Sequence, residues 1–164
     1  MSDQEKNKSA FIAIVGRPNV GKSSLLNSML GQKVSIVSRK PQTTRTRIMG
    51  VLTEGETQLV FIDTPGLLQP RNRLGEYMVR SVVESVSGVD TCLLVIEAGK
   101  KISRSAQELI DRFRSQNMPA VLAINKIDLL RDKSGLMEQI ASVSRLYDFE
   151  AVVPVSARTG SGIE

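Results

Sequence analysis

The stretch Gly16-Arg-Pro-Asn-Val-Gly-Lys-Ser23 decides how this chain folds, because it has the G-x-x-x-x-G-K-S pattern of a phosphate-binding loop. An apolar, β-prone run at 10–15 precedes it, and a helical pattern at 22–30 follows it. In such a strand–loop–helix setting, main-chain N–H groups and a helix N-terminus surround phosphate oxygens. The motif therefore predicts binding of a nucleoside phosphate.

Each part of this loop has an expected role. Lys22 would bring a mobile positive charge to the β- and γ-phosphates, which makes it a catalytic as well as a binding residue. The hydroxyl of Ser23 is placed to ligate Mg²⁺. We therefore predict that the nucleotide phosphates are held by Asn19, Val20, Gly21, Lys22, Ser23 and Ser24.

Strand and helix patterns alternate along the rest of the chain. Apolar β-type runs follow at 48–54, 57–63, 91–97, 119–125 and 151–155, and further helical spacings lie at 78–86, 106–113 and 136–147. Gly55 joins the first two runs as a tight hairpin, so one edge strand should be antiparallel. We predict a three-layer α/β fold of the P-loop nucleoside-triphosphatase type, with a six-stranded, mostly parallel sheet.

The two ends of the chain carry their own expectations. The polar residues 1–9 predict a disordered tail, and 10–164 a single domain. After the last strand, only Gly162-Ile-Glu resembles the start of another helix. Because an open parallel sheet needs helices over both faces, we expect the domain to be cut before its final helix.

Composition excludes several function classes. The absence of histidine excludes histidine-based catalysis, and a single cysteine, Cys92, excludes an internal disulfide and predicts a buried thiol. Hydrophobic content of 41% with 24% charged residues is that of a soluble globular protein. The net charge of +5 suits nucleotide or RNA partners without requiring them. With no membrane-spanning run and no signal-peptide pattern, we expect a cytoplasmic protein.

Asn125-Lys-Ile-Asp128 indicates which nucleotide is bound. It follows a buried strand, so it lies at the sheet edge where ligands bind. The Asp128 carboxylate would accept hydrogen bonds from N1–H and the 2-amino group of guanine, whereas adenine offers neither donor and would be rejected by about 10⁴-fold. Asn125 would tie the loop together and the Lys126 stem would lie along the base. A main-chain N–H at Ser156-Ala157 would reach guanine O6.

Two further stretches point to the γ-phosphate. Asp63, which opens Asp63-Thr-Pro-Gly66, would hold Mg²⁺ through water, and the N–H of Gly66 would meet the γ-phosphate. In the basic stretch 40–47, the hydroxyl of Thr43, Thr44 or Thr46 would reach both Mg²⁺ and the γ-phosphate. A simple turn and a solvated loop are the alternative interpretations.

Together these stretches resemble translation-factor-type GTPases, specifically the Era family. The resemblance covers G-R-P-N-V-G-K-S at 16–23, K-P-Q-T-T-R at 40–45, D-T-P-G-L at 63–67, N-K-I-D at 125–128 and S-A at 156–157. The stretch 40–45 favours Era over tRNA-modifying and double-domain ribosome-assembly GTPases. Those relatives remain alternatives, as does a P-loop ATPase or kinase, although the latter leaves N-K-I-D unexplained.

The resemblance implies a sheet with five helices and a GTP-hydrolysing switch that assists maturation of the small ribosomal subunit and its 16S rRNA. It places the Mg²⁺ ligands at Ser23 and Thr44, with Asp63 acting through water, and it implies a K⁺ ion near Asn19. Era proteins carry a C-terminal KH-type domain, for which this sequence has no counterpart, so rRNA contacts are expected mainly there. Peripheral association with a membrane stays open.

Leu67 indicates a slow intrinsic reaction. Small regulatory GTPases commonly place a glutamine at this position to orient the attacking water, and leucine neither donates nor accepts a hydrogen bond. Arg45 and Arg47 are candidates to supply charge in cis, with surface or partner contacts as the stronger interpretation. We expect a cation, another loop or a partner to complete the site.

Overall fold

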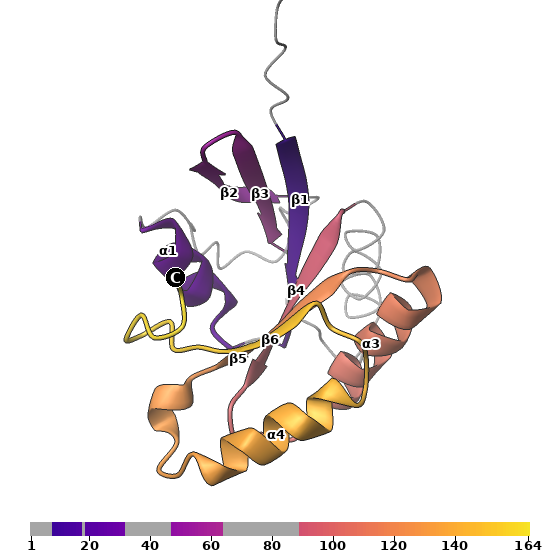
Figure 1. The fold of residues 1–164 in the computed structure, drawn as a ribbon, viewed down its shortest axis with the longest axis vertical. Helices are drawn as coiled ribbons and strands as arrows, with labels where there is room; N and C mark the ends of the chain where they lie inside the picture. Colours follow the sequence, from indigo (N-terminus) through magenta and orange to yellow (C-terminus); the bar gives the residue numbers. More distant parts are fainter. Residues whose placement is uncertain (1–7, 18, 32–46, 64–88) are drawn as a thin grey trace, which may run out of the picture.

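The computed structural model describes residues 8–17, 19–31, 47–63 and 89–164, and its strands form one six-stranded sheet. The sheet order is β2-β3-β1-β4-β5-β6 (Figure 1). All neighbouring strands are parallel except the β2–β3 pair. The strands are β1 (Lys8–Val15), β2 (Arg47–Glu54), β3 (Thr57–Asp63), β4 (Thr91–Glu97), β5 (Ala120–Asn125) and β6 (Ala151–Pro154). The predicted sheet, with its antiparallel edge strand, is confirmed.

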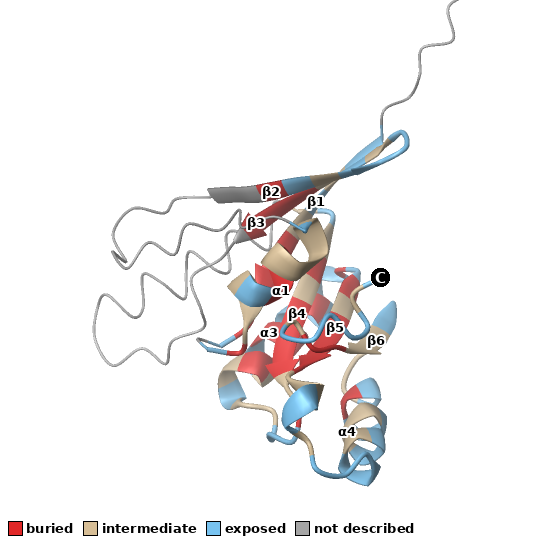
Figure 2. Cartoon of the chain, turned by 90° about the vertical axis from the view of Figure 1, so that its left-hand side faces the viewer, coloured by how far each residue is buried: buried red, intermediate tan, exposed pale blue. Residues whose placement is uncertain are grey.

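Helices lie on both faces of this sheet. The described helices are α1 (Lys22–Leu30), α3 (Arg104–Gln116), α4 (Ser134–Ser144) and a short 3-10 helix, η1 (Ile127–Leu129). Helix α1 packs into one apolar cluster and helices α3 and α4 into another, so the sheet is the middle of three layers (Figure 1). Strands β4 and β5 are mostly buried between these layers (Figure 2). The helix predicted at 78–86 lies outside the described residues.

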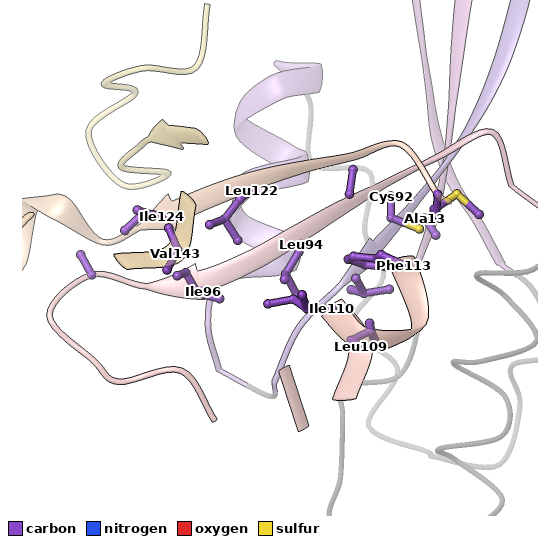
Figure 3. Packing of buried hydrophobic residues seen from close by; sticks show 14 residues of the cluster. Ala13, Cys92, Leu94, Ile96, Leu109, Ile110, Phe113, Leu122, Ile124 and Val143 are labelled. Carbon is purple, nitrogen blue, oxygen red and sulfur yellow. The ribbon is translucent and has the colours of Figure 1, made fainter. Parts of the chain in front are cut away.

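Alternation along the strands separates the two clusters. Within β4, Cys92 and Leu94 face α3 and α4, whereas Val95 faces α1. Phe113 of α3 is fully buried beside them (Figure 3). Cys92 is a buried free thiol, as predicted, and this burial raises the pKa of its thiol to about 12. The buried apolar strands thus fix the position of the polar residues at their carboxyl ends.

The first strand is longer than predicted. β1 begins at Lys8, so residues 8 and 9 belong to the sheet rather than to the N-terminal tail. The reason is pairing with β3, in which Lys8 lies opposite Thr57 and its N–H donates to the Glu56 carbonyl at 3.0 Å. A polar strand end that protrudes beyond the core carries no apolar signal.

Two predictions near the C-terminus were also wrong in detail. Helix α4 ends at Ser144, so Tyr147 lies beyond the helix. The Tyr147 hydroxyl donates a hydrogen bond to the Met118 carbonyl at 2.5 Å. The start of a helix expected at 162–164 is a turn, because Gly162 has a left-handed φ of 74°.

In the part of the chain that the structure describes, no helix is long and apolar enough to cross a membrane.

Candidate nucleotide-binding site

The phosphate loop follows β1 and is shaped by its glycines. A Cβ atom on Gly16 would lie 2.6 Å from the Val95 carbonyl oxygen, so the loop passes β4 more closely than a side chain permits. Gly21 has a φ of 94°, and a Cβ there would overlap the amide nitrogen of Asn125. Both glycines of the motif are therefore needed for close approach of the main chain.

Helix α1 starts directly behind this loop. The Leu25 N–H donates to the Gly21 carbonyl at 2.8 Å, which makes Lys22, Ser23 and Ser24 the first turn of the helix. No acidic residue lies in that turn, so nothing in it neutralises the positive end of the helix dipole. The Lys22 ammonium donates to the Gly16 carbonyl at 3.2 Å and thus lies back over the loop.

Asn125 joins three separate segments. Its side-chain Nδ2 donates to the Val20 carbonyl at 2.9 Å, and its Oδ1 accepts from the Ala157 N–H at 3.1 Å. The residue is only 2% exposed and both ends of its amide are paired. The phosphate loop, the end of β5 and the segment after β6 are therefore held together by one buried side chain.

Lys126 makes a second bridge between the same segments. It adopts a left-handed φ of 67°, and its ammonium donates to the Asn19 carbonyl at 2.6 Å. Asn19 is itself left-handed, with a φ of 68°. Left-handed non-glycine residues cost on the order of 1 kcal/mol each and cluster at functional sites. The lysine stem consequently crosses from the end of β5 to the phosphate loop.

The Asp128 carboxylate is oriented by Ser156. The Ser156 hydroxyl, which is fully buried, donates to Asp128 Oδ1 at 2.7 Å and accepts from the Thr159 N–H at 3.2 Å. Arg158 Nη1 lies 3.9 Å from the other carboxylate oxygen. The Asp128 side chain is only 16% exposed, although the residue as a whole is open to solvent. The hydrogen bond from Ser156 thus holds one oxygen of the Asp128 carboxylate in place.

Of the residues predicted to lie near the γ-phosphate outside the phosphate loop, Asp63 is among those that the structure describes. Asp63 is the last residue of β3 and lies opposite Ile14 of β1, two positions before the phosphate loop begins. Thr43, Thr44, Thr46, Gly66 and Leu67 lie outside the described residues. The structure thus brings Asp63, the phosphate loop, Asn125-Lys-Ile-Asp128 and Ser156-Ala157 to one edge of the sheet.

Sequence reasoning missed two side-chain contributions at this edge. It assigned Ser156 a main-chain role, whereas the structure shows its hydroxyl on Asp128. It did not single out Glu97, whose carboxylate lies 3.6 Å from the Lys126 ammonium. The signal for Glu97 was present, since an acidic residue ends a buried apolar strand at the ligand-binding edge.

Comparison with known proteins identifies the family. Residues 11–126 match the model of a family described as 50S ribosome-binding GTPases. The GTPase Era of Clostridioides difficile is 45% identical over 157 residues, which are 96% of this chain and 53% of that protein. The GTPase Era of Yersinia enterocolitica is 46% identical over 165 residues, covering 100% of this chain and 54% of that protein. The chain thus spans about half the length of the curated relatives that it matches.

Solved structures give the same result. A variant of Aquifex aeolicus Era bound to GDP.AlF4⁻ superimposes with a TM-score of 0.78 at 38% identity, over 93% of this chain and 52% of that one. Era in complex with MgGDPNP and nucleotides 1506–1542 of 16S ribosomal RNA gives a TM-score of 0.79 at 37% identity, over the same shares. The chain therefore belongs to the family of 50S ribosome-binding GTPases, and it is homologous to the GTPase domain of Era.

Proposed function

We propose that this chain binds GTP and GDP, hydrolyses GTP, and serves as the nucleotide-dependent switch of an Era-type protein. The observation that carries the proposal is the pair of side chains, Asn125 and Lys126, that reach from the base motif to the main chain of the phosphate loop at 2.9 and 2.6 Å. These contacts hold a phosphate site and a base site at a fixed separation, as a nucleotide requires.

Guanine specificity is assigned to Asp128. Its carboxylate would accept the two donors of guanine, and the Ser156 hydroxyl at 2.7 Å keeps it in one orientation before the base arrives. A pre-oriented acceptor loses little rotamer freedom on binding, which favours affinity. The Ala157 N–H donates to Asn125 Oδ1 and the Ser156 N–H donates to the Ser161 carbonyl, so the proposed contact of the 156–157 main chain with guanine O6 would share one of these two donors.

The residues at the phosphate edge fit Mg²⁺. Ser23 lies in the first turn of α1, and Asp63 is the last residue of β3, which pairs with β1, so a serine and an aspartate lie at the edge where the phosphate loop begins. Hard oxygen ligands are those that Mg²⁺ prefers. We assign Ser23 and Thr44 as direct ligands and Asp63 as a ligand through water. When bound, the ion would neutralise charge on the β- and γ-phosphate oxygens.

Slow hydrolysis is the proposed rate behaviour. Lys22 would exchange its bond with the Gly16 carbonyl for the β- and γ-phosphates, while Thr44 and Gly66 would contact the γ-phosphate. Leu67 offers no group to orient the attacking water. A K⁺ ion that the Asn19 side chain helps to hold is proposed as an accelerator, supported by the exposed position of Asn19 in the phosphate loop; the Asn19 carbonyl already accepts from the Lys126 ammonium.

The partner is proposed for the whole protein. A related Era binds a fragment of 16S ribosomal RNA, which favours the small ribosomal subunit and its rRNA as partners here too. We place the protein in the cytoplasm and assign rRNA reading mainly to a KH-type domain outside this chain, with peripheral membrane association as a separate proposal. Nucleotide-dependent cosedimentation with small ribosomal subunits, with and without an appended KH domain, tests the proposed ribosomal partner. Flotation with vesicles tests the proposed membrane association.

Phosphate release from GTP tests the enzymatic proposal. We expect slow, Mg²⁺-dependent turnover that rises when Na⁺ is replaced by K⁺, and that stays within a few-fold of wild type in Leu67→Ala. Lys22→Ala should lose tight nucleotide binding by about 100-fold or more, because it removes the charge that faces the phosphates. A large loss of rate in Leu67→Ala at unchanged GTP affinity would overturn the assigned role of Leu67.

A further inference from the structure

The Lys126 ammonium has a partner outside the nucleotide-binding motifs. Its Nζ lies 3.6 Å from Glu97 Oε2 while it donates to the Asn19 carbonyl at 2.6 Å. The two side chains of the ion pair are 31% and 25% exposed. Because both are largely withdrawn from solvent, the attraction is screened less than that of a surface pair. The ammonium thus lies between a carboxylate at the end of β4 and a carbonyl acceptor in the phosphate loop.

The main chain around Glu97 is fixed against the base motif. Glu97 ends β4 and lies opposite Asn125 in the register of β4 and β5. The N–H of the next residue, Ala98, donates to the Asn125 carbonyl at 2.8 Å. The Glu97 carboxylate therefore starts from a backbone position tied directly to the residue that precedes Lys126.

Helix α4 secures the other side of this loop through Gln139. The amide nitrogen of Gln139 donates to the carbonyls of Glu97 and Lys100, both at 3.1 Å, and its Oε1 accepts from the Gly99 N–H at 3.0 Å. One side chain thus engages three main-chain groups of residues 97–100, which we call the Glu97 loop. This loop turns sharply, with a φ of 77° at Gly99.

These contacts form a continuous path from α4 to the nucleotide site. Gln139 holds the Glu97 loop, Glu97 faces the Lys126 ammonium, and Lys126 crosses to Asn19 of the phosphate loop. We propose that Glu97 is a positioning residue for Lys126 and that Gln139 holds Glu97 in place, so that the Lys126 stem is kept along the guanine face of the site. The inference rests on the proposed function, because the stem is useful only where a nucleotide binds.

The inference predicts a specific kinetic pattern. Glu97→Gln keeps the size of the side chain and removes its charge, so Lys126 becomes less ordered. We expect labelled GDP to dissociate about threefold to tenfold faster, as for the loss of a partly buried ion pair. The KM for GTP should rise while kcat stays unchanged, because neither residue contacts the γ-phosphate.

A double-mutant cycle separates positioning from a general electrostatic effect. Lys126→Met keeps the apolar stem and removes the ammonium. In that background, Glu97→Gln should change the GDP dissociation rate by less than about twofold. Removal of a negative charge that acted directly on the phosphates would instead slow dissociation in both backgrounds, and that result would overturn the inference.

Gln139→Met tests the second part of the path. It is nearly isosteric and lacks the amide, and we expect dissociation of GDP to be about twofold to fivefold faster. Its effect should not add to that of Glu97→Gln. The matched control is Glu138→Gln, an exposed charge on the same helix, which should leave the rate unchanged. A lower melting temperature for Gln139→Met at an unchanged dissociation rate would assign it a structural role only.

The experiment distinguishes the inference from the proposed function. It uses the 164-residue chain and methylanthraniloyl-GDP, whose fluorescence reports dissociation. If the wild-type chain does not bind this probe saturably, the proposed function fails and the inference with it. If wild type binds and Glu97→Gln releases GDP at the wild-type rate, the inference alone is overturned.

Discussion

The phosphate loop and the base loop meet at one edge of the sheet, but they are built differently. The phosphate loop depends on the absence of side chains at Gly16 and Gly21, which allows the main chain to pass close to Val95 and Asn125. The base loop depends on side chains that are present, since Asn125 joins three segments and the Ser156 hydroxyl joins its own segment to Asp128. The first should therefore be damaged by adding atoms and the second by removing them.

Among the variants that compare the two loops, the largest loss of GDP affinity is expected for one added methyl group in the phosphate loop. Gly21→Ala must hold a φ of 94° and place a Cβ against the Asn125 amide, so it strains the loop and displaces the bridge. We expect at least about 30-fold weaker GDP binding, as for a perturbation of roughly 2 kcal/mol. Fluorescence titration with labelled GDP measures it.

Gly31→Ala is the matched control for this comparison. Gly31 also has a left-handed φ, of 64°, but no atom of the residues that the structure describes lies within 4 Å of a Cβ built there. It should cost about 1 kcal/mol of unfolding free energy and leave GDP affinity unchanged. Equal loss of affinity in both variants would show that backbone strain, rather than close approach, is what matters.

Removing atoms from the base loop should come next. Asn125→Ala leaves the Val20 carbonyl and the Ala157 N–H without their partner at a buried position. We expect the free energy of unfolding to fall by about 2–4 kcal/mol, together with weaker GDP binding. Urea unfolding followed by circular dichroism, with and without GDP, separates the two effects.

Asn117→Gly serves as its control, because Asn117 has a left-handed φ of 51° that glycine adopts freely. It should leave both stability and affinity nearly unchanged. Unaltered urea unfolding of Asn125→Ala would contradict the view that one buried amide holds the three segments together.

The smallest effect is expected for Ser156→Ala. Loss of the hydroxyl frees the Asp128 carboxylate, which should then pay more rotamer entropy on meeting guanine. We expect about fivefold weaker GDP binding, equivalent to roughly 1 kcal/mol. Ser115→Ala, which removes an exposed hydroxyl bonded to the Arg112 carbonyl, should bind GDP like wild type. Identical affinities of both variants would remove Ser156 from the base site.

The elements that the sequence predicted well are those that depend on local sequence patterns. The strand bounds of β3 and β4 and the start of α1 follow from apolar runs and from a glycine-rich motif, which are local signals. The contact of the Ser156 hydroxyl with Asp128, 28 residues away, could not be predicted, because it arises only where two distant segments meet. For Glu97, the end of a buried strand marked the position, but its partner Lys126, 29 residues away, could not be predicted. Tyr147 shows how a local pattern can mislead, because the helical spacing of apolar residues continues to this residue although α4 ends at Ser144.

Competition between guanine and adenine nucleotides tests the central claim most directly. Unlabelled GTP and GDP should displace labelled GDP from the chain, whereas ATP should need a concentration on the order of 10⁴-fold higher. In Asp128→Asn, the preference should move toward xanthine nucleotides, because an amide donates to the O2 of xanthine where the carboxylate accepted from the 2-amino group of guanine. Displacement by ATP at concentrations similar to GTP would contradict the assignment of a guanine-nucleotide site.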